Sequence, residues 1–110
     1  MSNLLYSPEA EKDLESIKKY ISEELNNPVA AINTLTKILK CIRRLEQFPE
    51  LGARLSSIID VVTDYRFLGC AKYIAFYRTD GNDVYIVRIL YGRRDYVKIL
   101  FEELDSNETN

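Results

Sequence analysis

The hydrophobic period changes once along this 110-residue chain, and the change divides it into a helical half and a strand half. Between Ser7 and Leu45, apolar residues recur at spacings of three and four, as in helices with one buried face. From Tyr65 to Tyr91 the period falls to two, and Tyr, Ile, Val and Phe become frequent, as in strands. This order of patterns predicts an α+β domain with helices packed on a sheet.

Two helices are expected in the first half, because the same start signal occurs twice. Ser7-Pro8 and Asn27-Pro28 each place a capping side chain before a proline, which is typical of a helix N-terminus. The second helix is expected to end near Phe48-Pro49. Because only residues 24–27 separate the two helices, we expect an antiparallel helical hairpin.

Three strands are predicted in the second half, over residues 65–69, 71–79 and 84–91. The Asp-Gly-Asn-Asp sequence at 80–83 predicts a tight hairpin turn between the last two. With a short apolar run before the first helix, the predicted order is β-α-α-β-β-β. A short last helix or edge segment should follow Gly92. We therefore expect one domain over residues 1–105 and a polar tail over 106–110.

The composition excludes several classes of chemistry. The chain has no histidine, which excludes serine triads, cysteine–histidine dyads and most transition-metal sites. It has no glycine-rich phosphate loop, and its sheet-half acids lack metal-ligand spacing, so no cofactor or metal is expected. No apolar run is long enough to cross a bilayer and no secretory signal is visible, so a soluble cytoplasmic protein is expected. For the same reason, Cys41 and Cys70 are predicted to be two buried thiols rather than a disulfide.

Basic residues concentrate in the strand half although the net charge is −2. Residues 66–98 hold seven basic and three acidic side chains. The basic ones are Arg66, Lys72, Arg78, Arg88, Arg93, Arg94 and Lys98. Arg88 is notable because it lies in the middle of an apolar strand, where a charge needs an anion or water. It either pairs with a neighbouring carboxylate or lies on the floor of an exposed groove that binds an acidic partner.

Tyrosines accompany these arginines and extend the candidate binding set. Their rings either anchor a protein interface or stack on bases, or they are amphipathic core residues whose hydroxyls reach water. The candidate residues for binding a macromolecular partner are Arg66, Tyr73, Tyr77, Arg88, Tyr91, Arg93, Arg94, Asp95 and Tyr96.

Several short motifs occur in an order that resembles a known family. They are Leu5-Tyr6-Ser7-Pro8-Glu9-Ala10, Phe48-Pro49, Tyr65-Arg66, Phe76-Tyr77 and the stretch from Val87 to Asp95. With them, the chain resembles the RelE/ParE superfamily of type II toxin–antitoxin toxins over about residues 3–101, and especially its ParE-like, plasmid-stabilisation branch. The resemblance implies a helical hairpin packed on a small twisted antiparallel sheet with a short C-terminal helix. It also implies a co-expressed antitoxin that folds across the toxin.

The resemblance implies two alternative targets. ParE-like members act on DNA gyrase, and RelE-like members cleave mRNA on the ribosome. In this chain a RelE-type endoribonuclease would use Arg66, Arg94 and Tyr96, but Ile74 stands where that branch has an arginine in the middle strand. The leading expectation is therefore a gyrase-binding toxin without catalysis of its own. A ribosome-dependent ribonuclease, or a non-toxic module that only binds its antitoxin, is the alternative, and a homodimer or a hetero-oligomer with the antitoxin is left open.

Overall fold

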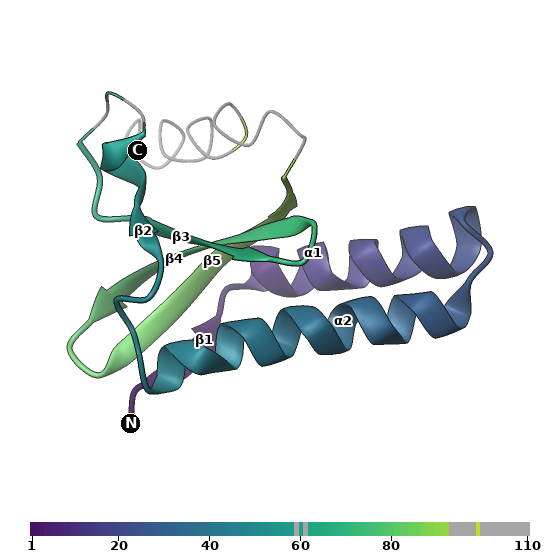
Figure 1. Ribbon diagram of the computed structural model, residues 1–110, viewed down its shortest axis with the longest axis horizontal. Helices are drawn as coiled ribbons and strands as arrows, with labels where there is room; N and C mark the ends of the chain where they lie inside the picture. The colour runs from purple at the N-terminus through teal and green to yellow at the C-terminus, as the bar shows by residue number, and fades with distance from the viewer. Residues whose placement is uncertain (59, 61, 93–98, 100–110) are drawn as a thin grey trace.

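Two helices cover one face of a five-stranded sheet in the computed structural model, which describes residues 1–58, 60, 62–92 and 99 (Figure 1). The helices are α1 (Pro8–Lys19) and α2 (Pro28–Arg43). The strands are β1 (Asn3–Tyr6), β2 (Ala53–Arg54), β3 (Arg66–Cys70), β4 (Tyr73–Asp80) and β5 (Asp83–Tyr91), in the spatial order β1-β5-β4-β3-β2. This arrangement confirms the predicted α+β class.

Both helices begin where the capping signals predict. The Ser7 hydroxyl accepts a hydrogen bond from the Ala10 amide at 3.0 Å, and the Asn27 side chain accepts one from the Ala30 amide at 3.1 Å. A π-helical turn, η1 (Tyr20–Glu24), continues α1, and a 3-10 turn, η2 (Arg44–Glu46), continues α2. The second helical segment therefore ends just before Phe48-Pro49, and the helical hairpin is confirmed.

The sheet is mixed rather than purely antiparallel, which corrects the expected topology. β1 pairs with β5 in parallel, with Leu4 opposite Val84, while the other neighbouring strands are antiparallel. β1 and β5 can be parallel because the whole helical hairpin lies between them in the chain. Between the helical hairpin and β3, the chain forms β2 and a 3-10 turn, η3 (Leu55–Ser57).

Most of the core lies between the helices and the sheet. Its largest fully buried side chains include Ile38, Ile42, Tyr77 and Ile86. On the opposite face, Leu55, Phe76 and Leu90 form a second buried cluster, against which Ile99 packs. The expected short last helix and the polar tail lie outside the described residues.

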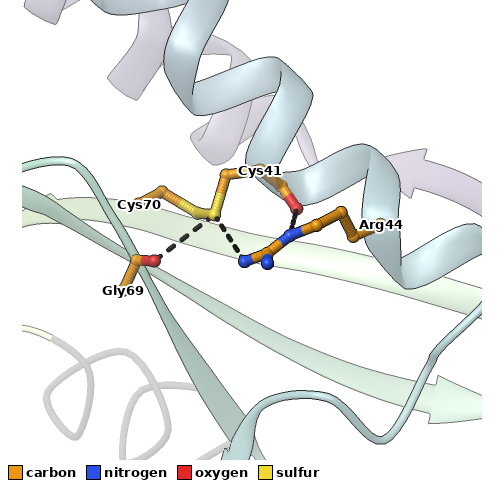
Figure 2. Close-up of a disulfide and its surroundings, with 4 residues drawn as sticks. All are labelled: Cys41, Arg44, Gly69 and Cys70. Atoms are coloured by element: carbon orange, nitrogen blue, oxygen red, sulfur yellow. Dashed lines mark hydrogen bonds between the residues drawn. A yellow bond between two sulfur atoms is a disulfide. The ribbon is translucent and has the colours of Figure 1, made fainter.

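The two cysteines form a disulfide between α2 and the end of β3, so the prediction of two free thiols was wrong (Figure 2). Cys41 and Cys70 are 29 residues apart in the sequence, but α2 packs on β3 and brings their Cα atoms to 5.7 Å. This distance lies within the range that a disulfide spans. The sequence separation carries no information about this contact, which depends on tertiary packing.

Candidate functional surface

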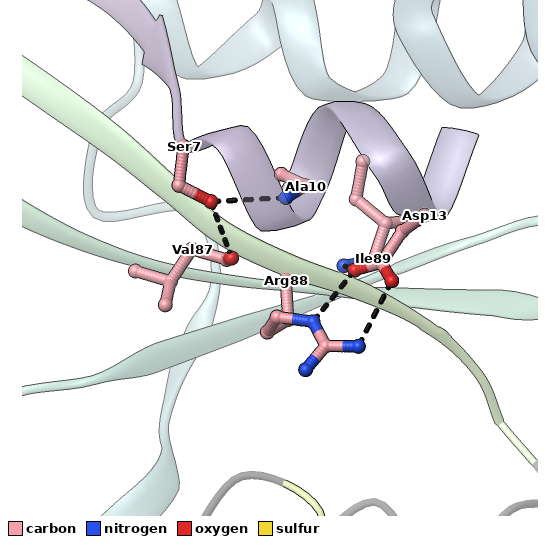
Figure 3. Close-up of polar contacts among 6 residues, drawn as sticks. All are labelled: Ser7, Ala10, Asp13, Val87, Arg88 and Ile89. Carbon is pink, nitrogen blue, oxygen red and sulfur yellow. Dashed lines mark hydrogen bonds and ion pairs between the residues drawn. The ribbon is translucent and has the colours of Figure 1, made fainter. Parts of the chain in front are cut away.

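Arg88 is neutralised within the chain by Asp13 of α1 (Figure 3). The Asp13 carboxylate accepts hydrogen bonds from Nε of Arg88 at 2.8 Å and from its Nη2 at 2.9 Å. Both side chains are largely buried, with exposed fractions of 15% and 13%. Of the two interpretations left open for Arg88, the structure therefore supports the pair with a neighbouring carboxylate, and the groove with Arg88 as its free cation is not present.

The same carboxylate also completes the edge of the sheet. β1 ends at Tyr6, opposite Ile86, so β5 continues beyond its parallel neighbour. There the backbone N–H of Ile89 donates to Asp13 at 2.9 Å. Ser7, the N-cap of α1, contributes a similar contact, because its hydroxyl donates to the Val87 carbonyl at 2.7 Å. The N-terminal part of α1 thus takes the place of a strand along this edge, and Arg88 is part of that attachment.

Tyr77 is fully buried and holds the connection before β2, so its assignment to a binding surface does not fit the structure. Its hydroxyl donates to the Pro49 carbonyl at 2.9 Å and accepts from the Gly52 amide at 2.8 Å. Burial raises the pKa of Tyr77 above the ordinary value of 10.0. Arg66 binds the same segment, because its Nη1 donates to the Gly52 carbonyl at 2.8 Å. Both side chains therefore position residues 49–54.

Tyr73 and Tyr91 lie side by side across β4 and β5, with ring centroids 5.6 Å apart. Both are partly exposed. Burial raises the pKa of Tyr73, and the phenols of Tyr91 and Tyr20 add to the effect. Tyr20, in η1, is therefore near this pair and is itself exposed. Tyr20 was not predicted as a site residue. The sequence nevertheless shows it as an aromatic residue that does not belong to the apolar stripe of Leu14, Ile17 and Ile21.

A groove with a volume of about 550 Å³ is lined by residues of β1, β4 and β5, by the start of α1 and by Tyr65. Its lining is mostly apolar or aromatic and comprises Leu5, Tyr6, Ser7, Pro8, Tyr65, Arg78, Tyr85, Ile86 and Val87, which we call the β1–β5 groove. The exposed Arg78 guanidinium lies 5.5 Å from the centre of the Tyr85 ring, in a cation–π contact. This pair was not among the candidates predicted from the sequence. The turn at 80–83 would have identified it, because that register places Arg78 opposite Tyr85.

Four exposed apolar side chains lie in the segment around the hairpin connection, between residues 20 and 32. They are Tyr20, Leu25, Val29 and Ile32, which we call the hairpin patch. Val29 and Ile32 are 68% and 60% exposed, and their spacing of three places them on one side of α2. In Figure 1 the connection between α1 and α2 lies at the opposite end of the molecule from the β4–β5 turn. Large apolar side chains that are exposed to solvent near one another are typical of interaction surfaces.

The described residues include an apolar groove and exposed apolar side chains, which are features of a binding surface. Among them, no group of three or more Cys, Asp or Glu side chains could hold a metal ion. The same residues include no helix long and apolar enough to cross a membrane. The predicted site residues Arg93, Arg94, Asp95 and Tyr96 lie outside the described part of the chain.

Comparisons with known proteins agree with this geometry. The sequence model of the family described as ParE toxin of type II toxin-antitoxin system, parDE, matches residues 4–96. Among solved structures, a chain from the chromosomal ParDE toxin–antitoxin system of P. aeruginosa is similar, with a TM-score of 0.70 and 26% sequence identity. The match covers 83% of this chain and 96% of that one. No curated protein matches.

Proposed function

Because the chain belongs to the ParE toxin family and is the toxin of a type II toxin–antitoxin module, we propose that it acts in the cytoplasm by binding DNA gyrase. The observation that carries the proposal is that the residues the structure describes hold no complete acid–base machinery for RNA cleavage. The sequence has no histidine, and Arg66, which a RelE-type ribonuclease would use, is engaged with the Gly52 carbonyl. Inhibition by binding needs no such machinery. We further propose that Arg93 and Arg94, with Asp95 and Tyr96, contact the target.

A supercoiling assay tests the target. Purified toxin is added to gyrase, relaxed plasmid and ATP, and we expect loss of supercoiling and accumulation of cleaved DNA. A double substitution, Arg93→Ala with Arg94→Ala, should raise the toxin concentration for half inhibition about tenfold or more, because arginines make strong charge-assisted contacts. Lys18→Ala with Lys19→Ala, two exposed basic residues in α1, is the matched control and should leave inhibition unchanged.

Two results would contradict the gyrase proposal. The first is unchanged supercoiling with no cleaved DNA at a toxin concentration that arrests cell growth. The second is cleavage of translated mRNA in a toeprinting assay that is lost in Arg94→Ala, which would instead identify a ribosome-dependent ribonuclease. Harmless overexpression together with intact antitoxin binding would identify a non-toxic binding module.

The partner implied by the family is an antitoxin, and we propose that it covers the β1–β5 groove and the hairpin patch. An apolar side chain would fill the groove beside Tyr85, and an acidic residue would pair with the exposed Arg78. An amphipathic helix would cover Val29 and Ile32 of the hairpin patch. Together these contacts would bury about 1,500 Å² or more of total surface.

Charge reversal in the groove tests the antitoxin site. Arg78→Glu should weaken antitoxin binding about tenfold or more, measured by isothermal titration, because it replaces an attraction with a repulsion. The control is Lys12→Glu, which reverses an exposed charge on α1 away from the groove lining. Equal affinity of the two variants would exclude Arg78 from the interface, while leaving the gyrase assay as an independent test of the toxin's target.

A further inference from the structure

The two cysteines of the disulfide, Cys41 and Cys70, differ in their exposure to solvent. Cys70 belongs to the main core and is 1% exposed. Cys41 is only partly buried, on the side of α2 that faces β3. Because Cys41 is the more exposed residue of the two, we expect a nucleophile from solution to attack the disulfide at Cys41 rather than at Cys70. This asymmetry is typical of cysteine pairs in which one sulfur exchanges and the other resolves.

A cation lies beside the accessible sulfur. Figure 2 shows the Arg44 side chain folded back over the last turn of α2, toward Cys41. Its Nε donates to the Cys41 carbonyl at 3.5 Å, and its Nη2 is 3.6 Å from the Cys41 sulfur. A guanidinium at this distance stabilises the negative charge of a thiolate. The neighbouring Arg43 is also exposed but interacts electrostatically with Tyr6, so it provides a natural comparison.

From the accessible sulfur and the adjacent guanidinium, we propose that Cys41 and Cys70 form a reversible redox site. Its substrates are dithiol reductants and the corresponding disulfide oxidants, and Cys41 is the exchanging cysteine. This site is separate from the β1–β5 groove, whose lining includes neither cysteine. The inference goes beyond toxin activity and does not depend on which target the toxin binds.

The exchange balances without any further reactant. A thiolate of the reductant attacks the Cys41 sulfur, a new S–S bond forms, and the bond to Cys70 breaks, so that Cys70 leaves as a thiolate and takes up a proton. The second thiolate of the reductant then attacks its own sulfur in the mixed disulfide. Cys41 leaves as a thiolate beside Arg44, and the reductant becomes a disulfide after giving up two electrons. Oxidation follows the same steps in reverse, with Cys41 as the attacking nucleophile.

The position of the bond gives the exchange a structural consequence. It ties α2 to β3 and closes the segment that contains β2 and η3 into a covalent loop. After the disulfide is reduced, only non-covalent contacts hold α2 against β3. The reduced protein should therefore unfold at a lower urea concentration than the oxidised protein, because the unfolded chain regains the freedom that the loop removed.

Trapping of the mixed disulfide tests which sulfur exchanges. The oxidised full-length protein is treated with reduced glutathione, quenched with acid and digested, and the glutathione adduct is located by mass spectrometry. We expect the adduct on Cys41. An adduct mainly on Cys70, or no adduct and no reduction under conditions in which a small-molecule disulfide is reduced, would overturn the proposal.

Alkylation rates test the role of Arg44. The fully reduced protein is treated with iodoacetamide, an uncharged probe, at neutral pH. Cys41 should react about tenfold faster than Cys70, and Arg44→Gln should slow Cys41 several-fold while Arg43→Gln does not. The substitutions leave both cysteines in place, and circular dichroism checks that each variant is folded. Equal rates at the two cysteines, or equal effects of the two substitutions, would overturn the assignment.

Discussion

At the scale of single residues, four partly or fully buried side chains of this toxin use their polar groups to bind main-chain groups of other elements. Ser7 and Asp13 bind the backbone of β5, while Tyr77 and Arg66 bind the connection before β2. Each of these contacts satisfies a carbonyl or an amide at the end or edge of an element, where regular secondary structure does not supply every partner. Substituting such residues should therefore affect stability before it affects any interface.

Gly52 is a residue that this packing makes irreplaceable. A Cβ atom at Gly52 would lie 2.7 Å from the Phe67 carbonyl oxygen and from the Tyr77 ring. Gly52→Ala should therefore destabilise the protein by about 2 kcal/mol or more, measured by urea unfolding of the oxidised protein. Gly69→Ala is the control, because a methyl group at Gly69 would have no neighbour within 4 Å, and it should change stability by less than about 0.5 kcal/mol. Equal effects would contradict this account.

The tyrosine hydroxyls make the stability of the folded protein depend on pH in the alkaline range. Burial raises the pKa of Tyr6, Tyr73 and Tyr77 above 10.0 in the folded protein. The unfolded chain then loses these protons first, so the stability that these groups contribute is complete below about pH 10 and is lost as pH rises through the folded values. Urea unfolding between about pH 8 and pH 11 should show this decline.

Tyr77→Phe separates this effect from the titration of other groups. The variant should be less stable at neutral pH by about 1–3 kcal/mol, because the Gly52 amide and the Pro49 carbonyl lose their partner. Above about pH 10, however, its stability should fall less steeply than that of the unsubstituted protein. Parallel curves for the two proteins would show that Tyr77 does not contribute to the alkaline decline.

At the scale of elements, the sequence predicts the features that depend on signals within a few residues. It does not predict the features that depend on contacts between distant parts of the chain. The starts of α1 and α2 and the β4–β5 turn follow from local capping and turn chemistry, so the sequence predicts them. The parallel pairing of β1 depends on β5, about 80 residues away in the register of Asn3 with Asp83. For the same reason, the sequence did not identify Asp13 as the carboxylate that pairs with Arg88 and did not predict the disulfide, because each joins elements that only the tertiary fold brings together.

The two tight turns of the sheet offer a reciprocal test of backbone strain. Gly81 has a φ of +60° in the β4–β5 turn, and Ala71 has a φ of +58° in the β3–β4 turn. A left-handed conformation suits glycine but costs about 1 kcal/mol with a side chain. Ala71→Gly should therefore stabilise the protein by about 0.5 kcal/mol, and Gly81→Ala should destabilise it by about 1 kcal/mol. Urea unfolding measures both, and changes of the same sign would contradict the argument.

At the scale of the whole molecule, the basic residues of the strand half that the structure describes do not form one basic concave surface. Among the described residues, Arg66 and Arg88 serve the fold, and Arg78 is the arginine of the strand half that lines the groove. The charge of a side chain can be read from the sequence, but whether that charge is paired within the fold depends on long-range contacts. The surface that remains for a partner is consequently more apolar than the count of arginines suggests.

This distribution predicts where an antitoxin protects the toxin from hydrogen exchange. On complex formation, amide exchange should slow at residues 20–32 around the hairpin patch and at 5–7 and 85–87 along the β1–β5 groove, because a bound partner covers these segments. Exchange in the β3–β4 turn around Ala71 should change little, which makes it the internal control. Mass spectrometry of the free and bound toxin resolves these segments. Protection confined to residues outside the groove and the hairpin patch would show that the antitoxin binds another face.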